Sequence, residues 1–338
     1  MTKERSDERG KLQRRTRVVW LALGGNLAIA IAKFVAAALT GSSAMASEGV
    51  HSLVDTSNEV LLLYGLRRAS APPDADHPFG HGREIYFWSF IVALLIFALG
   101  AGVSLYEGVL HLRHPAPLRD LALNYAVLGV SCVFEGVSWH ASWRELRRSH
   151  PGGSVVAAIR RSKDPSTFTV FLEDSVALAG LVIAGVGIGV AHALGRPEAD
   201  ALASILIAAL LGLASIFLAR ETKALLIGEP AHPQLRDSLL RIAAADEAIA
   251  HANGVYTAQL GPDRVLAALS AEFRDGLATD DIERCVRRLE RAIREAHPDV
   301  VALFVKPQPK AVWAERVERL VGSAQADIGA RRSNAGRS

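Results

Sequence analysis

The sequence has little cysteine. Only Cys132 and Cys285 occur among its 338 residues, and two isolated thiols make neither a disulfide framework nor a zinc ribbon. The motif His-Glu-x-x-His is absent, which argues against a membrane metalloprotease that carries its zinc on that motif. No small-residue cleavage site follows the first apolar run, so we expect no cleaved signal peptide after the charged leader MTKERSDERGKLQRRTR.

Long apolar runs, by contrast, are abundant. Half of the residues are hydrophobic, and the charged residues fall mostly in blocks between apolar runs, which is typical of a polytopic membrane protein. A spanning helix needs about 20 predominantly apolar residues. Six segments meet this requirement, and they are residues 18–39, 44–66, 84–110, 121–141, 166–193 and 199–219.

Basic residues predict the orientation of these spans. The leader is rich in lysine and arginine, whereas the first hairpin, TGSSAMAS, carries neither. Arginines follow the second, fourth and sixth spans, for example Arg67, Arg144 and Arg220. Because basic loops stay on the cytosolic side, both termini are predicted to lie in the cytosol.

A small soluble domain is predicted after the sixth span. A helical pattern runs from His232 to about Ala245, and GVYTAQLGP and RVLAALSAEF alternate as two strands. A second helix is predicted over 279–296 with Thr279 as its N-cap, and VVALFVKP closes as a third strand. The predicted fold class is an all-α six-helix transmembrane bundle with a C-terminal α+β domain of α-β-β-α-β, ferredoxin-like order. Its parts are a basic leader (1–17), a transmembrane domain (18–222), the cytosolic domain (223–310) and a partly disordered tail (311–338).

The second span is unusually rich in ionisable residues. The stretch SEGVHSLVDTSNEVLLLYGLR places Glu48, His51, Asp55 and Glu59 on one face of a helix. His51 and Asp55 are predicted to lie near the bilayer midplane. An unpaired carboxylate there costs several kcal/mol, so such groups face a partner, a water-filled cavity or an ion. A polar contact between helices is the alternative.

The fifth span supplies carboxylates at a similar depth. Asp164 is predicted as its N-cap and Pro165 as its first helical residue. Glu173 and Asp174 then lie about 12 to 15 Å into the helix, again near the midplane.

His51, Asp55 and Asp174 can meet if the second and fifth spans are neighbours. One imidazole and two or three carboxylates suit a divalent transition ion such as zinc, and they exclude manganese, cobalt or iron less than a cysteine-rich site would. Glu135 in the fourth span and Asn26 in the first either add polar groups or proton carriers nearby or form ordinary interhelical hydrogen bonds.

Taken together, these motifs resemble the cation diffusion facilitator family of zinc and related metal exporters. The resemblance rests on GSSAMASEGVHSLVD, on DADHPFGHGRE in the following loop, on an aspartate in the fifth span and on the α-β-β-α-β tail. It extends from about Val18 to Pro307. FLEDSVALAGLVIAG and FLARETKALLIGE resemble the branch that contains the mitochondrial zinc transporter of animals and its bacterial relatives.

The resemblance implies a homodimer, with no enzymatic activity and no nucleic-acid partner, in a bacterial inner (plasma) membrane. Its site would be exposed alternately to the two sides while Zn²⁺, or Mn²⁺, Co²⁺ or Fe²⁺, moves against protons. The ligand positions fall on His51, Asp55 and Asp174. The family's usual fifth-span histidine falls on Val170, which cannot bind metal, so the fourth ligand is either adjacent Glu173 or a water.

The loop motif offers a second metal site. Asp74, His77 and His81 match positions that bind metal in some relatives, and three ligands within eight residues can converge on one ion. The alternative is a network that orders the loop. In the cytosolic domain, FVKPQPK carries Lys306 and neither histidine nor cysteine where zinc-binding relatives have ligands. His232, His251 and His297 are predicted to be surface residues, so the domain would support dimer contacts.

Two other functions remain open at this point. A proton-coupled transporter of organic cations also needs buried carboxylates, but it predicts an aromatic-lined cavity, whereas valine, leucine, alanine and serine line the helix faces near His51 and Asp174. A non-transporting membrane scaffold with a degenerate metal site is the other alternative. It is suggested by Val170, which replaces a metal-binding histidine.

Overall fold

The computed structural model describes residues 23–115, 119–149, 155, 158–159 and 162–319. These form two compact units. Of the described residues, the first unit contains those up to Pro72 and from His81 to Leu226, and the second combines Pro73–Gly80 with those from Ile227 to residue 319. The predicted leader and residues 320–338 of the predicted tail lie outside the described part. Residues 310–319, at the start of that tail, are helical.

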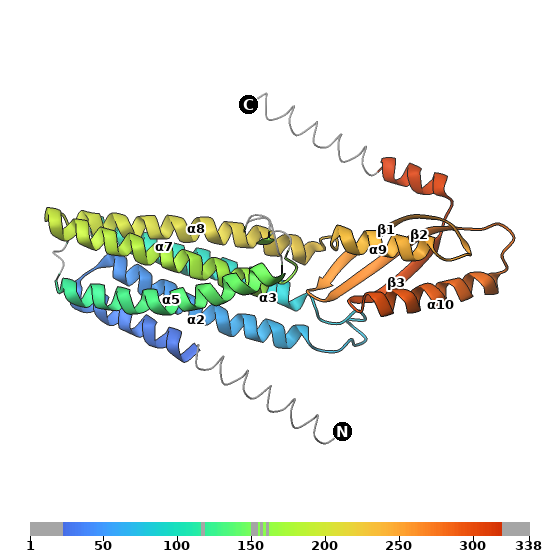
Figure 1. Cartoon of the computed structure of the whole chain (residues 1–338). Helices are drawn as coiled ribbons and strands as arrows, with labels where there is room; N and C mark the ends of the chain where they lie inside the picture. The colour runs from blue at the N-terminus through green and yellow to red at the C-terminus, as the bar shows by residue number, and fades with distance from the viewer. Residues whose placement is uncertain (1–22, 116–118, 150–154, 156–157, 160–161, 320–338) are drawn as a thin grey trace, which may run out of the picture. The chain divides into compact units, whose positions relative to one another are not determined.

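The first unit is a bundle of long helices (Figure 1). Its third long helix, Glu84–Arg113, is continuous and contains one π-helical turn. The elements are the Leu23–Thr40 helix, α2 (Ser43–Ala69), α3 (Glu84–Leu95), η1 (Ile96–Ala101), α4 (Gly102–Arg113), α5 (Leu121–Ser149), α7 (Pro165–Leu194) and α8 (Glu198–Ile227).

Five of these helices are long and apolar enough to cross a membrane, namely Leu23–Thr40, Glu84–Arg113, Leu121–Arg148, Pro165–Leu194 and Glu198–Ile227. The helix α2, with 27 residues, is also long enough to cross a membrane, but its stripe of ionisable residues makes it less apolar than the other five. Together they form an integral membrane protein, and the predicted all-α bundle is confirmed. Several helices extend past the predicted spans, because a helix continues wherever its backbone stays hydrogen-bonded, whereas the prediction followed apolar residues alone.

Local sequence signals set both ends of α7. The Asp164 side chain accepts a hydrogen bond from the Ser166 backbone N–H at 3.0 Å, and Pro165 occupies the first helical position, as predicted. At the other end Gly195 adopts a left-handed conformation with φ of 62°, which glycine tolerates without strain. The depth of every α7 side chain is therefore fixed by residues outside the pocket described below.

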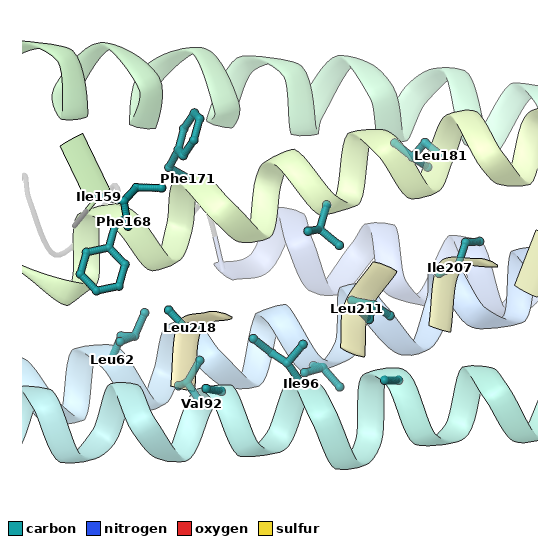
Figure 2. Close-up of a cluster of buried hydrophobic side chains, with 14 of the residues drawn as sticks. Leu62, Val92, Ile96, Ile159, Phe168, Phe171, Leu181, Ile207, Leu211 and Leu218 are labelled. Atoms are coloured by element: carbon teal, nitrogen blue, oxygen red, sulfur yellow. The ribbon is translucent and has the colours of Figure 1, made fainter. Parts of the chain in front are cut away.

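Apolar side chains hold the bundle together and place α2, α5 and α7 next to one another. The helix α2 packs against both α3 and α7, and α5 packs against α7. Figure 2 shows part of this core, including Leu62, Val92, Ile96, Phe168, Phe171, Leu181, Leu211 and Leu218. Other large apolar residues point outward, for example Val133, Val182 and Leu213, as lipid-facing residues do.

The second unit contains a three-stranded sheet. Its elements are α9 (Pro233–Ala244), β1 (Ile249–Gly261), β2 (Arg264–Phe273), α10 (Thr279–Ala296) and β3 (Val300–Pro307). The strand order is β1-β2-β3, with β1 antiparallel and β3 parallel to β2. The predicted α-β-β-α-β order is confirmed, but the N-cap of α10 is Ala278 rather than Thr279. The Ala278 backbone N–H donates to the Asp281 carboxylate at 3.0 Å, so an acidic residue inside the first turn takes over the capping.

An ion pair connects α10 to the turn that follows α9. The Arg288 guanidinium donates to both Asp246 oxygens, at 2.9 and 2.7 Å, and these hydrogen bonds lower the pKa of Asp246 to about 2. Burial, together with the neighbouring Asp246, raises the pKa of the Cys285 thiol to about 11. Cys285 is thus a buried, neutral core residue next to the pair.

Replacing Arg288 with alanine should lower the stability of the C-terminal domain at neutral pH, because it removes both hydrogen bonds to Asp246. The pKa of Asp246 is depressed in the folded state, so the stabilisation is fully present above about pH 4 and is lost as the pH falls through about 2. Backbone amides of α10 should exchange about fivefold faster with solvent deuterium in the full chain. Arg287→Ala, which breaks a longer and well-exposed pair with Glu283, is the matched control. Equal effects of the two variants would contradict the assignment.

Candidate functional site

Two side-chain contacts determine where α2 begins. Ser42 caps the helix by accepting a hydrogen bond from the Met45 backbone N–H at 3.1 Å. The buried carboxylate of Asp200, in the first turn of α8, accepts from the backbone N–H groups of Ser43 at 2.6 Å and Ala44 at 3.3 Å. A carboxylate at a helix N-terminus satisfies free N–H groups and matches the helix dipole. The start of α2, and hence the depth of its polar residues, is tied to α8.

His51 and Asp55 lie one turn apart on α2. His51 is only 2% exposed, and its Nδ1 lies 3.4 Å from the Asp55 Oδ1. Neither ring nitrogen of His51 has a hydrogen-bond partner among the described residues. A buried imidazole that makes no hydrogen bond among the described residues is available to bind a ligand, because burial without such a bond is otherwise unfavourable.

The two carboxylates of α7 are held by neutral donors on neighbouring helices. Asp174 Oδ2 accepts hydrogen bonds from the hydroxyls of Ser138 and Ser142 on α5, at 2.9 and 3.1 Å. Glu173 Oε1 accepts from the Asn58 side-chain amide of α2 at 2.7 Å. Hydroxyl and amide donors orient these carboxylates without neutralising their charge. They therefore leave that charge available for a cation.

A single pocket joins these residues. It is lined by Asn26, Ser52, Asp55, Glu59, Glu135, Val170, Glu173 and Asp174. Five of these eight side chains are carboxylic acids, which is unusual for the interior of a helix bundle in a membrane. His51 approaches the pocket through Asp55 but is not among the lining residues.

Asn26 and Glu59 are hydrogen-bonded to each other in the wall of the pocket. The Asn26 side-chain amide donates to Glu59 Oε1 at 2.6 Å, so the first helix contacts the polar stripe of α2. The hydrogen bond predicted as one alternative for Asn26 is present.

The candidate ligand atoms of His51, Asp55, Glu173 and Asp174 do not form a convergent metal-binding group in this structure. Within the described ranges, one group of three histidine or acidic residues has all its ligand atoms within 4.8 Å of one another, and it is Asp74, His77 and His81. These three belong to the loop between α2 and α3. The His77 backbone N–H donates to Asp74 Oδ1 at 2.6 Å, and His77 Nδ1 lies 3.2 Å from the same oxygen. The loop thus brings together the residues that its motif singled out.

Several buried polar residues that contact α2 or α7 were not found from the sequence. Lys33, Asn58 and Asp200 are all buried polar partners of the residues on α2 and α7. Lys33 does leave a signal, since a lysine within an otherwise apolar span is costly unless it is paired. Asn58 and Asp200 leave none, because their partners are distant in sequence.

In the C-terminal domain the histidines do not form a metal cluster among the described residues. His251 is exposed, and His297 Nε2 lies 2.8 Å from the Ser238 hydroxyl. Lys306 is exposed on β3.

Comparison with known proteins adds an independent line of evidence. The family model described as "Cation efflux transmembrane domain" matches residues 19–227. The mouse and human proteins named "Proton-coupled zinc antiporter SLC30A9, mitochondrial" are each 34% identical over 265 residues, which cover 78% of this chain and 47% of theirs. "Metal tolerance protein C4" of Arabidopsis thaliana is 32% identical over 288 residues, covering 84% of this chain and 63% of that protein. The chain thus spans about half the length of the mitochondrial relatives.

Asp200 uses both of its oxygens at the start of α2, because Oδ1 accepts from the Ser42 hydroxyl and Oδ2 from the Ser43 backbone N–H, each at 2.6 Å. Replacing Asp200 with asparagine should destabilise this start, because an amide has only one accepting oxygen. The expected loss is about 1 to 2 kcal/mol, measured as a lower midpoint of thermal unfolding in detergent. Glu198→Gln, an exposed change in the same first turn of α8, is the control and should leave the midpoint where it is. An unchanged midpoint for Asp200→Asn would show that the cap does not hold α2.

Proposed function

The chain belongs to the cation diffusion facilitator family, and from this premise we propose that it moves a divalent transition metal ion, zinc first of all, across a membrane in exchange for protons. Membership places it among membrane transporters, and we propose no enzymatic reaction. The names of the mitochondrial relatives describe proton-coupled zinc antiporters. The observation that carries the proposal is the pocket in which α2 and α7 present Asp55, Glu173 and Asp174.

The chemistry of the pocket suits a divalent cation. Carboxylates that crowd together in a medium of low dielectric repel one another, so they bind either a cation or protons. That exclusive choice is the basis of exchange, since metal binding displaces protons and protonation releases the metal. Two neighbouring helices supply the groups, so a small relative movement of α2 and α7 would change the coordination and the access.

We propose His51, Asp55 and Asp174 as ligands. Neither the His51 ring nitrogens nor Asp55 Oδ1 has a hydrogen-bond partner among the described residues. Glu173 is our candidate for the fourth ligand, with a water as the alternative. Val170 lines the same pocket, so the position where the family usually has a histidine faces the same space and is filled here by an apolar side chain.

We propose the Asp74, His77 and His81 loop as a second metal site. Its ligand atoms lie within 4.8 Å of one another, which a single zinc or similar ion could bridge. The two sites differ in setting, because Asp74 and His77 are more than half exposed. A regulatory or loading role is therefore more suitable for the loop than the transport step itself.

The assembly and location proposed for the chain follow the family resemblance. We propose a homodimer in a bacterial inner membrane with both termini in the cytosol. The distribution of arginine and lysine supports this orientation.

The alternatives fit the pocket less well. None of the described residues that line it is aromatic, whereas a site for organic cations generally uses aromatic faces. A scaffold with a degenerate site needs only the substitution at Val170. It does not require the donors from α2 and α5 that hold Glu173 and Asp174 in place.

Asp55→Asn and Asp174→Asn should each abolish zinc flux into proteoliposomes driven by a proton gradient, because each removes a proposed charged ligand. Glu107→Gln, a change in the middle of α4 and away from the pocket lining, is the matched control and should retain flux. Flux is measured with a zinc-sensitive dye inside the vesicles. Wild-type flux in either aspartate variant would overturn the ligand assignment, and absence of flux in the wild type would overturn the transport proposal.

Glu173→Gln should weaken zinc binding by about tenfold or more and reduce the protons released on binding, if Glu173 is a ligand. Val170→His should restore an imidazole and increase the preference for zinc over manganese. Calorimetric titrations in buffers of different ionisation enthalpy report affinity and proton release together. Glu173→Gln with unchanged affinity and proton release would leave water as the fourth ligand.

A further inference from the structure

A lysine is buried in the membrane bundle close to the pocket. Lys33 lies in the Leu23–Thr40 helix, and its side chain is fully buried. The ammonium donates to Glu48 Oε2 at 3.0 Å and to the Ser52 hydroxyl at 2.8 Å. Both partners belong to α2, so the first helix places a positive charge on the polar stripe of α2. Such a charge is tolerated inside a bundle only with a partner of this kind.

Only one of the two oxygens of the Glu48 carboxylate accepts a hydrogen bond among the described residues. Glu48 is fully buried, and its second oxygen, Oε1, has no hydrogen-bond partner within the described part of the chain. Gly180 of α7 lies directly against Oε1, and any side chain there would collide with the carboxylate. Gly180 thus leaves the room that this carboxylate oxygen fills. A buried carboxylate oxygen with no donor among the described residues favours a cation beside it, and in this structure that cation is the Lys33 ammonium on Oε2.

Glu48 lies on the same face of α2 as the residues that line the carboxylate pocket. Ser52 accepts the hydrogen bond from Lys33 and also lines the pocket beside Asp55 and Glu59. Glu48 and Asp55 are seven residues apart on α2, which is two helical turns or about 10 Å. Polar groups therefore continue along one face of α2 from Glu59 through Asp55 and Ser52 to Glu48.

We propose that Glu48 and Ser52 form a further cation subsite, separate from the pocket and from the loop site, and that the Lys33 ammonium occupies it as a tethered cation. The inference rests on the proposed function in so far as the pocket binds the transported metal. The ligand class is a small cation that accepts carboxylate and hydroxyl oxygens, such as a divalent metal ion. On this proposal, a metal ion that moved from the pocket along α2 toward Glu48 would have to displace the ammonium.

An ordinary interhelical ion pair would use the same residues but behave differently when the lysine is removed. If Lys33 only pairs with Glu48, loss of the ammonium leaves a carboxylate that takes up no metal. If the ammonium occupies a cation subsite, a metal ion replaces it. The number of bound metal ions separates the two.

The experiment counts Zn²⁺ bound to the purified full-length chain by equilibrium dialysis and elemental analysis. Lys33→Met should bind about one more ion per chain than the wild type, and the Lys33→Met, Glu48→Gln double variant should lose that gain. The same gain is expected when Asp55→Asn and Asp174→Asn are also present, so it does not depend on the proposed transport site. Failure of that site would show instead as a wild-type count that these two changes leave unaltered.

No gain in Lys33→Met would overturn the subsite, and so would a gain that survives Glu48→Gln. If Lys33→Met does not give folded protein, the count is made on Lys33→Gln. Its amide can still donate to Glu48 but carries no charge, so the extra ion should appear there too. Its absence in Lys33→Gln would equally overturn the proposal.

Discussion

The need to satisfy buried carboxylates determines much of the first unit. Each carboxylate inside a membrane bundle must meet a donor or a cation, because the surrounding medium solvates charge poorly. The chain meets this need mostly with neutral donors, as Ser138 and Ser142 do for Asp174 and Asn58 does for Glu173. Neutral donors hold the geometry but leave the charge. Lys33 pairs with Glu48, but the donors described for Asp174 and Glu173 are neutral, and a bound cation or protons would complete the pocket.

The helices that carry these groups are positioned by contacts remote from the pocket. Asp164 and Pro165 start α7, while Ser42 and Asp200 start α2. Because a helix rises about 1.5 Å per residue, a shift of one residue at either start would move every polar side chain on that helix and rotate it by about 100°. The caps thus act on the pocket through rigid helices, and the apolar contacts between α2, α3 and α7 keep the helices in register.

Much of this organisation could be predicted from sequence, for identifiable reasons. The bounds of α10 and β2 follow from periodicity, and the stripe on α2 follows from residues that are three or four apart, so local patterns suffice. The N-cap of α10 was predicted one residue late, because Thr279 is the better capping side chain but Asp281 binds the backbone from within the turn. Asn58 and Asp200 could not be assigned, because each acts on a residue more than 100 positions away. Such pairs exist only once the bundle has formed.

The exchange of a histidine for Val170 also changes the charge of the proposed site. An imidazole favours zinc, whereas carboxylates accept harder ions such as manganese more readily. With valine at position 170 and Glu173 beside Asp174, the pocket has fewer imidazoles and more negative charge than the family pattern implies. Selectivity for zinc would then rest largely on His51. If His51 is a ligand as proposed, the depth of that single ring, set by the start of α2, would be the structural feature on which the choice of metal depends.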